Sequence, residues 1–410
     1  MVHKNHIICE QCDLVLDLPK ITGHYVGVCP RCHNSLYHFH PQPVIYSLCY
    51  AITTLIFMFA MDFLPFIGIS SSGLSNNVDV LDYTQVLSSE NMSIVSLAVY
   101  FFMQILPFIA LSTIIITDIC YLSKTKFFHI KYLLKLYRFC LDWSMVEVFT
   151  VAVLVSLIKL VNLVEINYGY GFYCLIIFSF FYMLSITRYN LNEMWTFFCG
   201  SPEIVRKIQI GISAESQNFA RCQVCGSIVD GEYNNGLCER CGSKIKDKSK
   251  HSINKCLALV VAAICMYVPA NIYPMMVTTY FGVNEPSTII DGVIVLWQMK
   301  SYFVAIVILV ASICIPILKI VTLLYLCLMA KKIRKAKNKV QISFLYRLVE
   351  FIGKWSMVDV FVVAIMATIV RIGNFMVIYP GSAVFSFGIV VVLTMLAARQ
   401  FDPRLLWGKI

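Results

Sequence analysis

The sequence has few charged residues. Asp, Glu, Lys and Arg make up 14% of its 410 residues, whereas 59% are hydrophobic. Soluble domains run nearer a quarter charged and half apolar, which disfavours an ordinary cytosolic enzyme. The mean hydropathy is +0.75, and the apolar residues fall into blocks of about 20, the length that crosses a ~30 Å hydrocarbon core. The composition therefore predicts a protein that lies largely in lipid.

Several functional motifs are absent. The chain contains no G-x-x-x-x-G-K-[ST] loop, no H-E-x-x-H and no G-x-S-x-G, so NTP hydrolysis and peptidase or esterase chemistry have no visible site, and we expect no enzyme. Carboxylates deep in the apolar blocks, the usual proton relay, are scarce. The first residues lack the basic and apolar regions of a secretory signal, which predicts that no signal peptide is cleaved.

The sequence is a tandem duplication. Two CxxC pairs recur, the first at an offset of 213 residues and the second at 209. Further matches follow at 209 or 212 residues: Pro65 with Pro274, Pro107 with Pro316, Trp195 with Trp407, and Trp143-Ser144-Met145-Val146-Glu147 with Trp355-Ser356-Met357-Val358-Asp359. So many collinear matches indicate two copies of one unit. We predict four domains: zinc ribbon 1 (1–41), transmembrane module 1 (42–200), zinc ribbon 2 (201–252) and transmembrane module 2 (253–410).

The apolar blocks of each module predict four transmembrane helices. The predicted fold class is therefore an all-α polytopic membrane protein with about eight spans. The predicted spans are 44–64, 93–122, 143–164 and 170–188 in the first half, and 255–276, 301–329, 355–376 and 381–399 in the second. The four duplicated tryptophans lie at predicted helix ends and are expected to form an interfacial belt.

The loops predict the orientation. Segments 67–92 and 278–299 contain no Lys or Arg, whereas 123–142 and 330–354 are rich in both. The positive-inside rule places the basic loops, both termini and both ribbons in the cytoplasm. Nucleic-acid binding is a rival interpretation of the basic run from Lys331 to Lys339, but a juxtamembrane run more often faces anionic lipid headgroups, so we expect no nucleic-acid partner.

Eight of the 17 cysteines form two sets with the spacing of zinc ribbons: Cys9, Cys12, Cys29 and Cys32, and Cys222, Cys225, Cys238 and Cys241. Four thiolates close a tetrahedral Zn²⁺ shell, so we expect two structural sites whose metal contributes folding free energy of order 10 kcal/mol. A rubredoxin-like iron site and a thiol redox switch are the alternatives. The other nine cysteines are scattered and disfavour a disulfide framework.

The residue after the second cysteine of each knuckle is informative. It is Asp13 and His33 in the first ribbon, and Gly226 and Gly242 in the second. A zinc knuckle needs a positive φ angle at this position, which glycine adopts freely and Asp or His tolerates.

Polar residues inside the spans are the default functional candidates, because polar groups in hydrocarbon are costly unless paired. The third span of each half has three at i, i+3 and i+6, which predicts one helix face: Ser156, Lys159 and Asn162, matched by Thr368, Arg371 and Asn374. Glu147 and Asp359 enter the same helices nearer the cytoplasmic end. Snorkelling of Lys159 and Arg371 to the outer headgroups is the alternative.

Lys319 is a separate case. It follows Pro316 by three residues in an otherwise uncharged span, and the matching residue of the first half is Ala110. A proline frees backbone carbonyls and kinks a helix, which favours a cavity where an ammonium finds acceptors. We expect a polar site peculiar to the second module, with Thr394 as a candidate partner.

The chain resembles the paraquat-inducible protein A family. The resemblance rests on the duplicated ribbons, the two Trp-Ser-Met-Val motifs, Pro316-Ile317-Leu318-Lys319 and the tail Phe401-Asp402-Pro403-Arg404-Leu405-Leu406-Trp407, and covers essentially the whole chain. The related lipophilic envelope-spanning tunnel protein A shares the layout. The resemblance implies an inner-membrane protein of Gram-negative bacteria that transports lipid between membranes with a periplasm-spanning MCE-domain partner, supporting envelope integrity.

A mechanism follows as a hypothesis: phospholipid chains lie against apolar helix faces, with the phosphate near Lys319 or Arg371. A zinc- or redox-responsive membrane sensor and a proton-coupled small-molecule transporter are the alternatives. A sensor needs a labile, exposed metal site, whereas a transporter should work in liposomes without a periplasmic partner.

Overall fold

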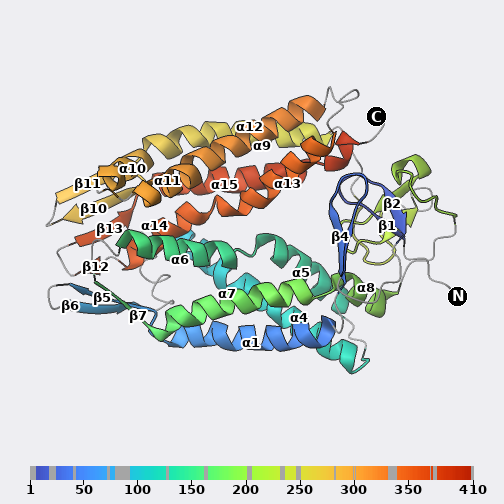
Figure 1. Ribbon diagram of the computed structural model, residues 1–410, viewed down its shortest axis with the longest axis horizontal. Helices are drawn as coiled ribbons and strands as arrows, with labels where there is room; N and C mark the ends of the chain where they lie inside the picture. The colour runs from blue at the N-terminus through green and yellow to red at the C-terminus, as the bar shows by residue number, and fades with distance from the viewer. Residues whose placement is uncertain are drawn as a thin grey trace.

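The computed structural model describes residues 6–17, 25–39, 43–71, 74–78, 93–125, 129–160, 165–200, 206–230, 236–245, 251–280, 283–298, 300, 302–330, 339–369, 371–372 and 376–407. The fold is mostly helical. In Figure 1 the helices form a long bundle, with the ribbons at one end and small β-sheets at the other.

The helices of the bundle are grouped as module 1 and module 2, in chain order. Module 1 contains α1 (Pro43–Phe63), α3 (Ser93–Tyr100), η1 (Phe101–Ile105), α4 (Leu106–Leu122), α5 (Ile130–Trp143), α6 (Val146–Leu160), α7 (Tyr170–Arg188) and α8 (Leu191–Cys199). Module 2 contains α9 (His251–Ile272), α10 (Ile289–Gln298), α11 (Tyr302–Leu309), η3 (Val310–Cys314), α12 (Ile315–Ala330), α13 (Lys339–Trp355), α14 (Val358–Ile369), α15 (Ala383–Gln400) and η5 (Pro403–Leu406).

Among the described residues, seven helical segments are long and apolar enough to cross a membrane: Pro43–Phe63, Ser96–Leu122, Ile130–Ile158, Tyr170–Arg188, Ser252–Ile272, Val310–Met329 and Ala383–Gln400. They confirm the predicted polytopic membrane fold. The predicted span at 355–376 has no such helix, because α14 is only 12 residues long.

The third segment of each module consists of two helices. We predicted loops at 123–142 and 330–354, but these stretches contain the amphipathic helices α5 and α13. The Trp-Ser-Met motif separates α5 from α6, and its copy separates α13 from α14. Ser144 of this break accepts a 2.7 Å hydrogen bond from the hydroxyl of Tyr182 on α7. Since both groups are buried, the break lies within the helix bundle rather than at the membrane–water interface.

The duplicated prolines widen the second span of each module. Pro107 and Pro316 are the second residues of α4 and α12, and each follows one turn of π-helix, η1 or η3. A proline lacks a backbone N–H and crowds the preceding turn, and a π-turn is one way to absorb that disruption. The structure thus shows a π-turn before each proline, and the predicted kink and cavity at Pro316 stay predictions.

Small antiparallel sheets close the end of the bundle away from the ribbons. In module 1, β5 (Ile67–Ser71) pairs with β6 (Leu74–Val78) and β7 (Glu165–Tyr168). In module 2, the strand order is β11 (Val283–Ser287), β10 (Met276–Tyr280), β13 (Met376–Pro380) and β12 (Arg371–Ile372). Ile67 lies opposite Tyr168, and Met276 opposite Pro380. These sheets tie the end of each module's first helix to the start of its fourth.

The two modules meet through their third segments, since α6 packs against α14 (Figure 1). Phe149 and Phe361 form an edge-to-face pair, with ring centroids 5.7 Å apart. Nearer the ribbons, Arg399 donates to the Asp142 carbonyl at 2.8 Å and lies 4.8 Å from the centre of the Trp143 ring. Apolar packing and cationic contacts to a backbone carbonyl and an indole ring thus join the modules.

Candidate metal centres and polar sites

Each ribbon gathers its four cysteines around one point. The strands are β1 (His6–Ile8), β2 (Val15–Asp17), β3 (Tyr25–Val28) and β4 (Ser35–Phe39) in ribbon 1, and β8 (Phe219–Arg221) and β9 (Ile228–Asp230) in ribbon 2, which also has the short helix η2 (Glu215–Gln217). In each set the four sulfur atoms lie within 4.8 Å of one another, and all eight cysteines are buried.

The knuckle geometry agrees with the predicted φ angles. φ is 61° at Asp13, 56° at His33 and 70° at both Gly226 and Gly242. In each knuckle the N–H of this residue donates to the carbonyl of the first cysteine, as from Asp13 to Cys9 at 3.0 Å. The turn therefore directs both thiols of a CxxC to the same side.

The donor set fits a tetrahedral metal ion. A tetrahedron with metal–sulfur bonds of ~2.3 Å has edges of about 3.8 Å. The closest pairs of sulfur atoms are 3.5 Å apart in ribbon 1 (Cys9 with Cys32, Cys12 with Cys29) and 3.5 to 3.6 Å apart in ribbon 2. Four buried thiolates suit Zn²⁺ and offer no further position for water. We conclude that both clusters are candidate metal sites.

Ribbon 1 packs on module 2, and ribbon 2 packs on module 1. Ribbon 1 packs on module 2, where the Arg31 guanidinium lies 4.9 Å from the centre of the Trp407 ring and Arg347 donates to the carbonyls of Cys32 and His33. Ribbon 2 packs on module 1, where its cysteines join the hydrophobic core and Arg240 donates to Thr196 at 2.7 Å. Each ribbon therefore contacts the module that does not follow it directly in the sequence.

The ribbons also contact each other. Arg221 of ribbon 2 forms a 2.8 Å ion pair with Glu10 and donates to the Ile8 carbonyl at 3.1 Å. Backbone hydrogen bonds join Val15 to Ile212 and Ala214 to Asp13. The two ribbons thus form one unit that spans the ends of both modules.

Two of the four tryptophans do not lie in the expected belt. Trp195 is fully buried in the core of module 1, and Trp407 packs against ribbon 1. The charges beside these tryptophans in the sequence look like interfacial anchors, but tertiary packing covers both rings.

The predicted polar stripe is only partly helical. Ser156 of α6 and Thr368 of α14 are buried and donate to the carbonyl four residues earlier, Ala152 and Ala364. Lys159 lies in the last turn of α6, and Asn162 and Asn374 lie outside the described residues. The prediction that Arg371 shares a helix face is wrong, because α14 ends at Ile369 and Arg371 begins strand β12. Pairing with β13 replaces the helix there.

Lys319 is almost fully buried in α12, with 1% of its surface exposed. Its ammonium donates to the carbonyl of Gly353 on α13 at 3.3 Å. This hydrogen bond places the end of the Lys319 side chain against the backbone of α13. Thr394 is buried on α15 and donates to the Val391 carbonyl, and no hydrogen bond joins it to Lys319 in the described part of the chain.

Glu147 and Asp359 occupy matched positions in the first turns of α6 and α14. A carboxylate in the first turn is stabilised by the helix dipole. Because α6 and α14 pack together, both acids lie on elements that form the module interface.

A buried polar cluster around Asp118 is not apparent from the sequence. Asp118 of α4 is fully buried and accepts a 2.5 Å hydrogen bond from Ser47 of α1. One residue away, the hydroxyls of Thr117 and Tyr189 lie 2.8 Å apart. Asp118 lies near a predicted helix end and resembles an interfacial residue in sequence. Only the packing of α1 against α4 reveals its partner.

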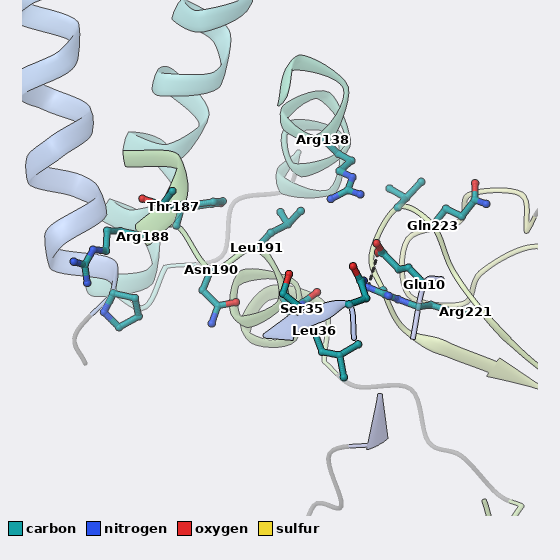
Figure 2. A pocket seen from close by; sticks show the side chains of 16 residues that line it. Glu10, Ser35, Leu36, Arg138, Thr187, Arg188, Asn190, Leu191, Arg221 and Gln223 are labelled. Carbon is teal, nitrogen blue, oxygen red and sulfur yellow. Dashed lines mark ion pairs between the residues drawn. The ribbon is translucent and has the colours of Figure 1, made fainter. Parts of the chain in front are cut away.

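A pocket of about 270 Å³ lies where both ribbons meet module 1. Its lining includes Glu10 of ribbon 1, Arg221 of ribbon 2, Arg138 of α5 and Arg188 at the end of α7. Figure 2 shows the Arg138 guanidinium pointing from α5 toward the space between Leu191 and the Glu10–Arg221 ion pair. Sequence patterns gave no signal for this pocket, because segments far apart in the sequence build it.

Comparisons with known proteins agree with the duplicated architecture. The family described as paraquat-inducible protein A matches residues 46–198 and 253–410, which lie in both helical modules. The chain is 33% identical over 408 residues to the intermembrane transport protein PqiA of Escherichia coli strain K12, a match that covers 98% of this chain and 96% of that protein.

Two further relatives extend the comparison. The chain is 26% identical over 401 residues to the lipophilic envelope-spanning tunnel protein A of the same strain, which covers 97% of this chain and 90% of that protein. It is 27% identical over 412 residues to a probable intermembrane transport protein of Haemophilus influenzae, with coverage of 97% and 95%. No solved structure matches the chain.

Proposed function

The chain belongs to the paraquat-inducible protein A family, and we propose that it is the inner-membrane component of a system that moves lipid between the two membranes of a bacterial envelope. The observation that carries the proposal is similarity over nearly the whole chain to proteins named for intermembrane transport. Such a role requires a multi-pass membrane protein, and the seven apolar helices meet that requirement.

The proposed orientation places both ribbons and both termini in the cytoplasm. The positive-inside rule supports it, since the connections at the ribbon end carry the Lys and Arg residues. The sheets then face the periplasm, and we propose that a periplasm-spanning tunnel protein with MCE domains docks there. We propose four domains, at 1–41, 42–200, 201–252 and 253–410. In the cell, the protein would support the integrity of the envelope.

We propose that phospholipid is the cargo and that Lys319 contacts its phosphate. An ammonium has three N–H donors, and in the described part of the chain Gly353 accepts a hydrogen bond from one of them. Arg371 lies in strand β12, so it does not share a helix face with the polar residues of α14. Eight further residues remain candidates for the polar network: Ser156, Lys159, Asn162, Thr368, Asn374, Thr394, Glu147 and Asp359.

The test replaces Lys319 with Ala, and with Met to preserve volume, and measures phospholipid crosslinked to the protein in the envelope. We expect at least a fivefold loss of lipid in both variants, because the phosphate loses its cation. Lys300→Ala, an exposed lysine outside the spans, is the matched control and should load normally. Undiminished loading of the Lys319 variants at normal protein levels would contradict the proposal.

A pull-down from membranes tests the partner separately. We expect a tunnel protein with MCE domains and phospholipid to co-purify with the full chain. Transport of a small molecule into liposomes by the chain alone would favour the carrier alternative instead.

We propose that the ribbons hold two structural Zn²⁺ ions that brace the cytoplasmic ends of the modules. Burial of all eight cysteines supports a brace over a sensor, because a sensor needs an exposed, labile site. Elemental analysis of purified protein should find two zinc ions and little iron per chain. Iron in both sites, or reversible oxidation of the thiols, would contradict this assignment.

A further inference from the structure

The pocket at the junction of the ribbons and module 1 has an excess of positive charge. Arg138, Arg188 and Arg221 line it, and the acid among its lining residues is Glu10. Glu10 already forms a 2.8 Å ion pair with Arg221, and Figure 2 shows Arg188 extending away from that pair, which leaves Arg138 as the cation that faces it. The remaining charge suits an anion, and guanidinium groups bind the oxygens of phosphate in a planar, two-point fashion.

Arg221 is held in place before any ligand binds. Two of its nitrogens are occupied, one by Glu10 and the other by the Ile8 carbonyl at 3.1 Å. Its third nitrogen, Nε, is buried and has no hydrogen-bond partner among the described residues. A buried donor without an acceptor costs free energy unless water or a ligand satisfies it. Because Arg221 lines the pocket, a bound anion is one acceptor that would satisfy this donor.

The pocket lies at the level of the membrane surface. Pro43, the first residue of span α1, and Arg188, the last residue of span α7, both line it. Next to Arg188, the first turn of α8 begins at Leu191 after the cap residue Asn190, and a helix N-terminus favours negative charge. On α1 beside Pro43, Ile45 and Tyr46 are exposed, so acyl chains can lie against this helix while a headgroup reaches the arginines.

We propose that this pocket binds a phosphoryl group, through Arg138 and Arg221, at the ribbon-side surface of the membrane. The phosphoryl group comes either from an anionic phospholipid headgroup or from a free phosphate. Its binding would join both ribbons to module 1, since the lining belongs to all three. The site is separate from Lys319, and the proposal stands whether or not lipid is the transported cargo.

The test uses the purified full-length protein in neutral detergent and calorimetric titration. The probes are short-chain phosphatidylglycerol, short-chain phosphatidylcholine and inorganic phosphate. We expect phosphatidylglycerol to bind the wild type at least tenfold more tightly than phosphatidylcholine, whose choline is repelled by the arginines. Inorganic phosphate binding as tightly as phosphatidylglycerol would support the proposal with a soluble anion as the source.

Two variants locate the site. Arg138→Gln removes a pocket cation that no described ion pair uses, and Gln223→Glu adds an anion to an exposed lining residue with little change in shape. Each should weaken binding at least tenfold. Lys135→Gln, one turn away on α5 and outside the lining, is the matched control and should bind normally. Unchanged affinity in both pocket variants, or no binding of any probe to the wild type, would overturn the proposal.

Discussion

Single residues at positive φ or in close contact decide where the chain can turn. Asp13 and His33 adopt the same left-handed conformation in ribbon 1 that Gly226 and Gly242 adopt in ribbon 2. The duplicated ribbons thus share a backbone although one uses side chains that tolerate this conformation less well than glycine. The requirement comes from the two thiols of each knuckle, which must point to the same side to join one four-cysteine cluster.

Gly169 and Gly381 are a duplicated pair, 212 residues apart. A Cβ atom would lie 2.0 Å from the Pro65 carbonyl oxygen at Gly169, and 2.1 Å from the Pro274 carbonyl oxygen at Gly381. Each glycine therefore lets the start of the fourth helix meet the backbone that follows the first helix. The shared role of Pro65 and Pro274 becomes clear only from this contact.

Gly169→Ala or Gly381→Ala should destabilise the protein by about 3 kcal/mol, because the atoms in the way belong to the backbone and cannot rotate aside. The measurement is the midpoint of thermal unfolding in detergent. Gly388→Ala in α15, where no atom lies within 4 Å of the added Cβ, is the control and should be neutral or slightly stabilising. Equal midpoints for Gly169→Ala and Gly388→Ala would contradict this explanation.

The third segment of each module begins with a helix where the sequence predicted a loop. Residues 130–143 are amphipathic and basic. Their charge alone predicts a cytoplasmic loop. They form a helix because the apolar face packs on α4, with Leu134 and Tyr137 buried. The following break at Ser144 then lets α6 turn toward α14.

Charges at matched positions of these segments have opposite signs. Arg138 and Asp142 of α5 correspond to Glu350 and Lys354 of α13 at an offset of 212 residues. Lys354 donates to the Leu141 carbonyl at 3.2 Å, across the module interface. Burial raises the pKa of the Glu350 carboxyl, and Arg399 and Arg138 oppose that shift. Opposite charges favour pairing of module 1 with module 2 over pairing of like modules.

Arg399→Ala should weaken this interface by about 1–2 kcal/mol, because it removes a hydrogen bond to the Asp142 carbonyl and a contact with the Trp143 ring. Arg399→Lys should lose less, since it keeps the charge but not the planar contact. Thermal unfolding of the two variants measures the difference. Thr187→Ala, the matched position of module 1, is the control; a drop as large as that of Arg399→Ala would argue against a specific interface.

At the scale of the molecule, the ribbons connect the modules rather than extend them. Ribbon 2 is continuous with the hydrophobic core of module 1, whereas the cysteines of ribbon 1 form a separate cluster that Trp407 contacts. Loss of metal should therefore affect the two halves differently. A ribbon without metal has too small a core to stay folded.

We expect Cys222→Ser with Cys225→Ser to lower protein abundance and the unfolding temperature more than Cys9→Ser with Cys12→Ser, because the second ribbon is part of the module 1 core. Treatment with a strong zinc chelator should reproduce both effects in the wild type. The measurements are protein level in membranes and unfolding in detergent. Serine pairs with wild-type stability, or a chelated protein that unfolds at the normal temperature, would rule out a structural metal.

The sequence by itself determined the two four-cysteine sets, the duplication and the apolar spans, because these depend on spacing along the chain and on hydrophobicity. The four positive-φ positions could be predicted for the same reason: a CxxC knuckle is a local structure. The membrane fold and both four-cysteine clusters follow from such short-range patterns.

Only the tertiary structure decided which polar groups are buried and what they contact. The Gly353 acceptor of Lys319 lies 34 residues away, and the Glu10 partner of Arg221 lies in the other ribbon. Arg371 leaves the helix because a strand from the same module offers hydrogen bonds that a span end lacks. The crossed ribbons and the arginine pocket have the same origin, since both arise where segments far apart in the sequence come together in the fold.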